Sequence, residues 1–155
     1  MFGLFKRYDV HLCPDVSGVV LYQGQPVEGL TITRSLTYYY GKEQLDHTVT
    51  DAEGRFSFPE INIRSSKPGS MFDVSRTYQE IKTNYENQEH RLWFSVFHGI
   101  ENRAEYVEKL TTLTCELTNE AVKFSFENRH NPHLRFTAIS NSVWEKDYRV
   151  TVRLD

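Results

Sequence analysis

Ser17-Gly-Val-Val-Leu-Tyr-Gln-Gly-Gln-Pro-Val-Glu-Gly-Leu-Thr-Ile32 contains two apolar runs on either side of a Gly-Gln-Pro turn. Glycine tolerates a positive φ and proline presets φ, so this tripeptide favours a chain reversal between two strands. A second turn follows at Asp51-Ala-Glu-Gly54 and leads into the alternating segment Arg55-Phe-Ser-Phe58. Alternating apolar and polar side chains bounded by turns are typical of strands with one face in a core. These segments predict a β-fold, but they carry no evident chemistry.

The composition of the whole chain also favours β-structure. The chain has 155 residues, which is the size of one ordinary domain, so we expect residues 1–155 to form a single β-sandwich domain with its own core. Aromatic residues make up 14% of the chain and suit the half-buried surface of a sheet. The net charge is −3, and lysine and arginine form no stripe, which argues against a nucleic-acid partner.

The amino terminus and the hydropathy indicate where the protein resides. Residues 1–10 place their basic side chains after the apolar ones and are followed by no long apolar run, unlike a signal peptide. No apolar run approaches the length of a membrane span, so we expect no membrane association. The expected location is the cytoplasm, or the periplasm only if a leader is missing from this sequence.

Turn signals divide the chain into roughly eight to ten short strands, the pattern of a β-sandwich. We expect strands over residues 16–22, 27–38, 45–51, 55–58, 71–84, 90–97, 110–117, 122–126 and 148–154. The segment 90–97 is apolar on both faces, which is typical of a central strand. In the last strand, alternation predicts inward-facing side chains at Tyr148, Val150, Val152 and Leu154.

The segments between these strands are less regular. Residues 1–15 are expected to be a lead-in, and residues 59–69 an exposed loop because they contain Arg64-Ser-Ser-Lys-Pro-Gly69. Residues 101–108 are compatible with one helical turn or a loop. The sequence leaves the structure of residues 134–144 open.

The glycine and proline positions of the two turns resemble a known family. Gly18-Val-Val20, Gly24, Pro26-Val27, Gly29 and Ile32, followed by Thr50-Asp51-x-x-Gly54-x-Phe56-x-Phe58, are similar to the carboxypeptidase-regulatory-like domains of the transthyretin-like β-sandwiches. The resemblance implies a transthyretin-like sandwich, here with additional C-terminal strands. Domains of this family are mostly non-catalytic modules that support or recognise another molecule, so the resemblance implies a fold and leaves the function open.

The remainder of the chain resembles a second group. Segments from Arg64 to Phe72, from His90 to Phe94 and from Leu113 to Glu120 are similar to small bacterial proteins whose genes often lie near type VI secretion effectors. This resemblance implies a protein that binds another protein, namely an immunity or adaptor protein that blocks a toxin. An accessory domain that self-associates through an exposed strand edge is the alternative.

Metal and thiol chemistry find little support in the sequence. His130 and His133 are the only closely spaced histidines, and the intervening Pro132 prevents the helical presentation of a zinc motif. Cys13 and Cys115 lie about a hundred residues apart in strand-like surroundings, which favours two buried thiols, with a disulfide as the alternative. No cofactor or metal is expected.

Enzymatic motifs are likewise missing from the sequence. There is no Gly-x-Ser-x-Gly elbow, no phosphate loop and no EF-hand. The transthyretin-like hydroxyisourate hydrolases end on Tyr-Arg-Gly-Ser, whereas here Tyr148-Arg149 continues as Val-Thr-Val-Arg-Leu-Asp. We therefore expect a protein that is not an enzyme.

Two segments are candidates for binding a partner. Tyr38, Tyr39 and Tyr40 stand at a strand end, where alternation turns one or two of the rings outward and makes them available to an interface. Arg64, Lys67 and Arg76 supply cations that would attract an acidic partner surface. Trp93 is expected in the core, and Trp144 in the core or at its rim.

Overall fold

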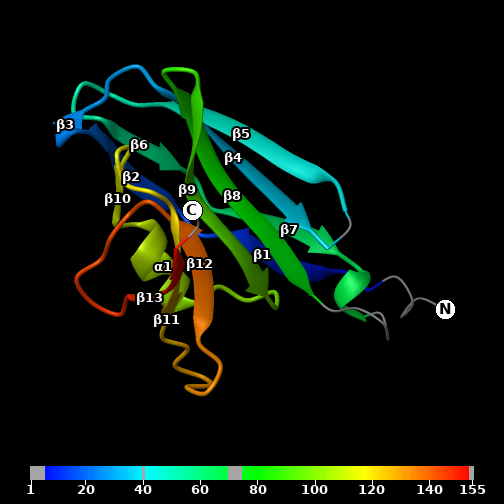
Figure 1. Ribbon diagram of the computed structural model, residues 1–155. Coiled ribbons are helices and arrows are strands. Elements are labelled where there is room, and N and C mark those ends of the chain that lie inside the picture. The colour runs from blue at the N-terminus through cyan, green and yellow to red at the C-terminus, as the bar shows by residue number, and fades with distance from the viewer. Residues whose placement is uncertain (1–5, 40, 70–74, 154–155) are drawn as a thin grey trace.

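The structure of the protein is a computed structural model that describes residues 6–39, 41–69 and 75–153 (Figure 1). Within these ranges the chain forms thirteen strands, one α-helix and a 3₁₀ turn at Lys67–Gly69. The elements are β1 (Tyr8–Cys13), β2 (Val16–Tyr22), β3 (Gln25–Pro26), β4 (Thr31–Tyr38), β5 (Glu43–Val49), β6 (Arg55–Phe58), β7 (Ile61–Ser65), β8 (Arg76–Tyr85), β9 (Gln88–His98), α1 (Ala104–Leu110), β10 (Leu113–Glu116), β11 (Val122–Phe126), β12 (Phe136–Ser140) and β13 (Arg149–Arg153). No helix in these ranges is long and apolar enough to cross a membrane.

The strands form an all-β sandwich. The larger layer is a seven-stranded sheet in the order β13-β11-β12-β9-β8-β4-β5. The other layer contains a four-stranded sheet, in which β2 pairs with β10, β3 and β6, and the two-stranded sheet of β1 and β7. Apolar side chains of both layers and of α1 form one buried cluster. The expected sandwich is therefore confirmed, with more strands than the sequence indicated.

The smaller layer is a bent ribbon that corrects two of the predictions. β1 leads into β2 past Pro14, and β6 leads into β7 past Pro59. Proline has no N–H to donate, so the backbone pairing is interrupted at each of these residues. The two interruptions lie opposite each other, because the β1–β7 pairing ends at Cys13 and Ile61 and the β2–β6 pairing begins at Val16 and Phe58. The predicted lead-in over residues 1–15 is thus wrong for β1, and the predicted loop over residues 59–69 is wrong for β7.

The hairpin of β8 and β9 forms the middle of the large sheet. Its turn is at Glu86 and Asn87, which have φ of 50° and 63° and lie between the predicted strands 71–84 and 90–97. A bulge between Ile81 and Lys82 places an extra residue in β9. The consecutive side chains of Leu92 and Trp93 are therefore both fully buried, which explains why this strand reads as apolar on both faces.

Two polar side chains inside the sandwich, Gln79 and Arg34, make specific hydrogen bonds. The Gln79 amide donates to the carbonyl oxygen of Leu12 at 2.9 Å and accepts the Trp93 indole N–H at 3.0 Å. The fully buried Arg34 guanidinium donates to both carboxylate oxygens of Asp46, at 3.0 and 2.6 Å, and lies 4.7 Å from the centre of the Phe58 ring. The hydrogen bond from Gln79 to Leu12 and the contact of Arg34 with Phe58 join the two layers, whereas the other two contacts lie within the large sheet.

The two cysteines are free thiols, and both are buried. Cys115 lies in β10, which pairs parallel to β2 with Cys115 opposite Val20. Burial raises the pKa of Cys13 from 9.0 to about 12, in spite of the nearby Arg34 guanidinium, and raises the pKa of Cys115 above its ordinary value. Neither thiol is poised for nucleophilic or redox chemistry.

The C-terminal strands extend the large sheet beyond β9. The segment left open, residues 134–144, contains β12, and Trp144 lies half-buried at the rim of the core. Val150 is 49% exposed on the edge strand β13, so its predicted burial is wrong. An extra residue in β13, Thr151, shifts the register of this strand against Lys123 and Phe124 of β11. The side chains of Val152 and Leu154 lie outside the described residues.

Candidate functional site

Four of the six predicted partner-binding residues lie together. The Lys67 ammonium is 5.9 Å from the centre of the Tyr38 ring and 5.2 Å from that of Tyr39. The Arg76 guanidinium is 5.4 Å from the Tyr39 ring and 6.0 Å from the ring of Tyr78. We call Tyr38, Tyr39, Lys67, Arg76 and Tyr78 the basic–aromatic cluster.

The tyrosines of this cluster differ in orientation. Tyr38 is only 4% exposed, and its hydroxyl hydrogen-bonds with the Ser75 hydroxyl at 3.0 Å, so it is mainly a core residue. Tyr39 follows with a positive φ of 56° and is partly exposed. The third predicted tyrosine, Tyr40, lies outside the described residues. Of the two tyrosines of this run that the structure describes, Tyr39 is therefore the more exposed.

Arg64 does not join the cluster. It lies on β7, where its guanidinium donates to the carbonyl oxygen of Arg7 at 3.3 Å and pairs with the Asp9 carboxylate at 3.7 Å. Both members of this ion pair are largely exposed, so it contributes little to stability.

An apolar groove that the sequence did not indicate separates β9 from β12. The two strands share the single register pair of Phe94 and Ile139, whereas β11 and β12 share five pairs. The opening has a volume of about 600 Å³. Its walls include Phe94, Val96, His98, Leu134, Phe136 and Ile139. We call this opening the β9–β12 groove.

Side-chain hydrogen bonds replace the missing backbone ladder beneath the groove. The Ser95 hydroxyl donates to the carbonyl oxygen of Thr137 at 2.9 Å and hydrogen-bonds with the Tyr106 hydroxyl at 2.7 Å. Burial raises the pKa of Tyr106 above its ordinary value, so this phenol stays protonated. The separation of β9 and β12 is therefore held by buried contacts and belongs to the packed core.

The charged side chains that line the β9–β12 groove are basic, while two carboxylates lie just outside this lining: Glu80 is the register partner of Phe94, and Asp147 pairs with Arg135. Lys123, Arg135 and His98 contribute to its walls, and no aspartate or glutamate does. Arg135 is held in place by the Ser125 hydroxyl at 3.0 Å and by Asp147 at 3.3 Å. In a chain with a net charge of −3, the groove is a local concentration of cationic side chains next to apolar ones.

The basic–aromatic cluster continues into the β9–β12 groove. Arg76 is the register partner of His98, and Tyr78 is the register partner of Val96, across the β8–β9 pair. Arg76 and Tyr78 of the cluster thus lie beside the groove on the outer side of the large sheet. The sequence predicted only the part of this surface that Tyr39, Lys67 and Arg76 contribute. The residues of the β9–β12 groove could not be predicted, because their proximity depends on which strands pair.

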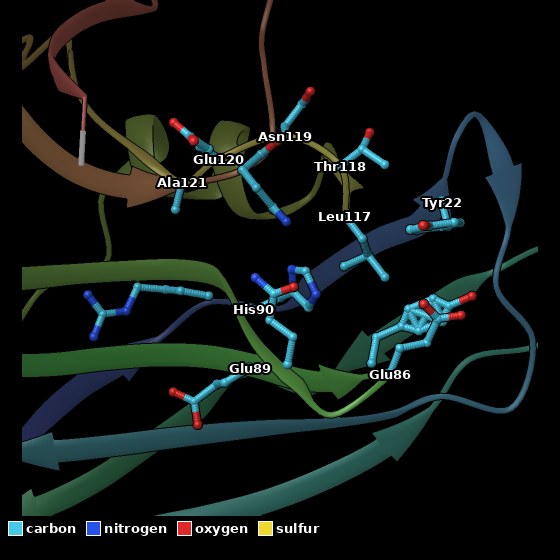
Figure 2. Close-up of a pocket in the computed structure, with 13 residues that line it drawn as sticks. Tyr22, Glu86, Glu89, His90, Leu117, Thr118, Asn119, Glu120 and Ala121 are labelled. Atoms are coloured by element: carbon cyan, nitrogen blue, oxygen red, sulfur yellow. The ribbon is translucent and has the colours of Figure 1, made fainter. Parts of the chain in front are cut away.

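A second, polar groove lies at the tip of the β8–β9 hairpin. Figure 2 shows it between this hairpin, with Glu86 and His90, and the loop Thr118–Ala121. It has a volume of about 610 Å³. Its lining includes the half-buried rings of Tyr22 and Tyr85 and the buried side chain of Asn141. We call it the hairpin-tip groove.

The remaining candidate residues form no site. His130 and His133 are both exposed on the loop between β11 and β12. In the ranges that the structure describes, no group of three or more histidine, cysteine, aspartate or glutamate side chains could hold a metal ion.

Comparison with curated proteins finds no match, and comparison with solved structures finds none either. A family model matches residues 16–120, which begin at the first residue of β2 and end in the loop before β11. The matched segment contains the whole basic–aromatic cluster and the β9 side of the β9–β12 groove, whereas the β12 side lies beyond it. Because the match spans well over half of the chain, the protein belongs to the family described as Domain of unknown function (DUF6795).

Proposed function

We propose that this protein is a non-enzymatic protein-binding module. Its ligand is an acidic segment of another protein that carries apolar side chains, and this segment occupies the β9–β12 groove and extends over the basic–aromatic cluster. The observation that carries the proposal is an apolar opening between two strands whose walls contain cations and no carboxylate. An acidic partner would be attracted to this opening, and a partner with a basic surface would be repelled.

The apolar part of this surface favours a protein ligand. Leu134 is 68% exposed and Tyr78 is 37% exposed, and both adjoin the half-buried Phe94 and Val96. Exposed apolar side chains that lie together and are surrounded by polar ones are typical of protein interfaces. Tyrosine and arginine, which both occur here, are enriched among residues that dominate binding energy.

The resemblance to bacterial proteins encoded near type VI secretion effectors supports a specific biological role for this module. We propose an immunity or adaptor protein of the cytoplasm that covers a toxin or effector surface and thereby blocks its active site or its assembly. A preformed groove with walls held by buried hydrogen bonds suits such occlusion, because little conformational entropy is lost on binding.

The test is co-purification with the product of the neighbouring gene, followed by titration of the pair. We expect the double variant Leu134→Glu/Lys123→Glu to weaken binding by at least about tenfold, since it places carboxylates where the partner has its own. Expression of this variant should no longer protect cells from the partner's toxicity. Leu45→Glu on β5 is the matched control, because Leu45 is similarly exposed at 57% but lies at the far edge of the sheet. Equal binding by the wild type and the groove variant would overturn the proposal.

Self-association is the second candidate function, and β5 favours it. Among the described strands, β5 pairs with β4 only, and it exposes Leu45 and Val49 at 57% and 58%. Such an edge can pair with the same edge of a second copy. Light scattering should then show a concentration-dependent dimer that Leu45→Glu abolishes, while a monomer at all concentrations would exclude this function.

A further inference from the structure

We infer that the hairpin-tip groove is a binding site for a neutral saccharide. This groove lies at the tip of the β8–β9 hairpin and shares no lining residue with the β9–β12 groove (Figure 2). The inference therefore stands independently of the proposed protein-binding function. Its volume of about 610 Å³ falls within the range of small-molecule sites.

The first observation is the side chain of Asn141, which lines the groove and is 2% exposed. In the described part of the protein, neither Nδ2 nor Oδ1 of this amide has a hydrogen-bond partner. Its neighbours are satisfied, because the Ser140 hydroxyl donates to the carbonyl oxygen of Leu92 and the Ser142 hydroxyl accepts the Thr114 N–H. A buried amide with both atoms unpaired destabilises a fold unless something binds it, so the site calls for a ligand.

The second observation concerns the charges at the rim. Glu89 pairs with Lys82 at 3.6 Å, and Arg91 pairs with Glu80 at 2.9 Å, so these charged groups already have partners of opposite sign. Other lining side chains, such as Gln88, His90 and Glu120, make no hydrogen bond within the described residues and are available to a ligand. Glu86 and Glu120 also line the groove, and neither is in an ion pair among the described residues, so the groove is mildly acidic and would repel an anionic ligand. A ligand that is polar and uncharged is compatible with this lining.

The chemistry of hydroxyl groups matches this lining. An amide presents a donor and an acceptor side by side, and each hydroxyl of a sugar both donates and accepts. Tyr22 and Tyr85 add an apolar platform, with ring centres 5.1 Å apart and planes at 81°. An aromatic ring beside planar polar groups can stack on the C–H face of a sugar while the amide binds its hydroxyls.

The experiment is a titration of the ¹⁵N-labelled full chain with maltose, lactose and chitobiose, combined with binding to an array of neutral glycans. We expect saturable shifts of the Asn141 side-chain amide signals and of the backbone signals of residues 118–121. Asn141→Leu should abolish these shifts and keep or raise the melting temperature, since it replaces two unsatisfied polar atoms by an apolar isostere. His47→Gln on β5 should bind like the wild type.

Two results would overturn the inference. One is the absence of saturable binding to every glycan tested, and the other is full saccharide binding by the Asn141→Leu variant. If that variant does not fold, Gln88→Ala at the exposed rim serves in its place and should weaken saccharide binding several-fold. An acidic peptide that shifts only signals of β9 and β12 would bear on the proposed protein-binding function and leave this inference unchanged.

Discussion

At the scale of single residues, the buried pair of Arg34 and Asp46 shows how one charge is accommodated in an apolar core. The Arg34 side chain is fully buried, while the Asp46 side chain is 34% exposed. The bidentate contact therefore reaches from the interior to the edge of the sheet and lets the charge of Arg34 be balanced from the solvent side. Such a pair is weak evidence for net stabilisation, but removing one partner leaves a buried charge uncompensated.

Asp46→Asn tests this at the residue scale. We expect the variant to lower the free energy of unfolding by about 3 kcal/mol, because the Arg34 guanidinium loses its counter-charge while still buried. Urea unfolding followed by tryptophan fluorescence measures the change. Asp9→Asn is the control, since its pair with Arg64 is exposed and should change the stability by less than about 0.5 kcal/mol. Equal effects of the two variants would contradict this account.

At the scale of the element, β1 is the clearest difference between expectation and structure. Its outward residue Asp9 is exposed, whereas Val10 and Leu12 are fully buried between the layers. The carbonyl oxygen of Leu12 also accepts the hydrogen bond from Gln79, so the strand supplies both apolar and polar contacts to the core. Although β1 precedes the segment matched by the family model, it is a structural part of the sandwich.

Leu12→Ala tests the contribution of β1. We expect a loss of about 3 kcal/mol in the free energy of unfolding, which is typical of truncating a fully buried leucine. Asp9→Ala on the opposite face of the same strand should cost less than about 0.5 kcal/mol. Thermal or urea unfolding of both variants measures these changes in the free energy of unfolding. A Leu12→Ala variant as stable as the wild type would show that β1 contributes little to the core.

The elements also show how far the sequence predicts this fold. The turns at Gly24 and Gly54 and the strands that flank them follow from local chemistry, since only a few residue types tolerate a positive φ. β7 was missed because its short alternation is followed by a loop-like composition. The β9–β12 groove could not be predicted at all, because it lies between two strands that are far apart in the sequence and share a single register pair. Asn141 carries no local signal either, since its lack of partners depends on the whole packing.

At the scale of the whole molecule, burial links stability to alkaline pH. The pKa of Cys13 is raised from 9.0 to about 12, and Cys115 and Tyr106 are shifted in the same direction. Above pH 9.0 the unfolded chain releases thiol protons that the folded protein retains. The stabilisation by these groups is therefore complete below pH 9.0 and is lost progressively as the pH rises toward 12.

The measurement is urea unfolding at a series of pH values above 9. We expect the free energy of unfolding to fall by about 1.4 kcal/mol per pH unit for each buried thiol that ionises only on unfolding. The double variant Cys13→Ala/Cys115→Ala should show a shallower decline, whatever its stability at neutral pH. A decline as steep as that of the wild type would mean that other groups cause it.

The turn after β2 is tied to a residue synthesised much later. The N–H groups of Gln23 and Gly24 donate to the Glu116 carboxylate at 3.1 and 2.7 Å, across 93 and 92 positions of the chain. At a translation rate of roughly 5–20 residues per second, one side of β2 remains unpaired for several seconds before its parallel neighbour β10 is synthesised. A nascent chain arrested before Leu113 should consequently bind a holdase chaperone more strongly than one released at full length.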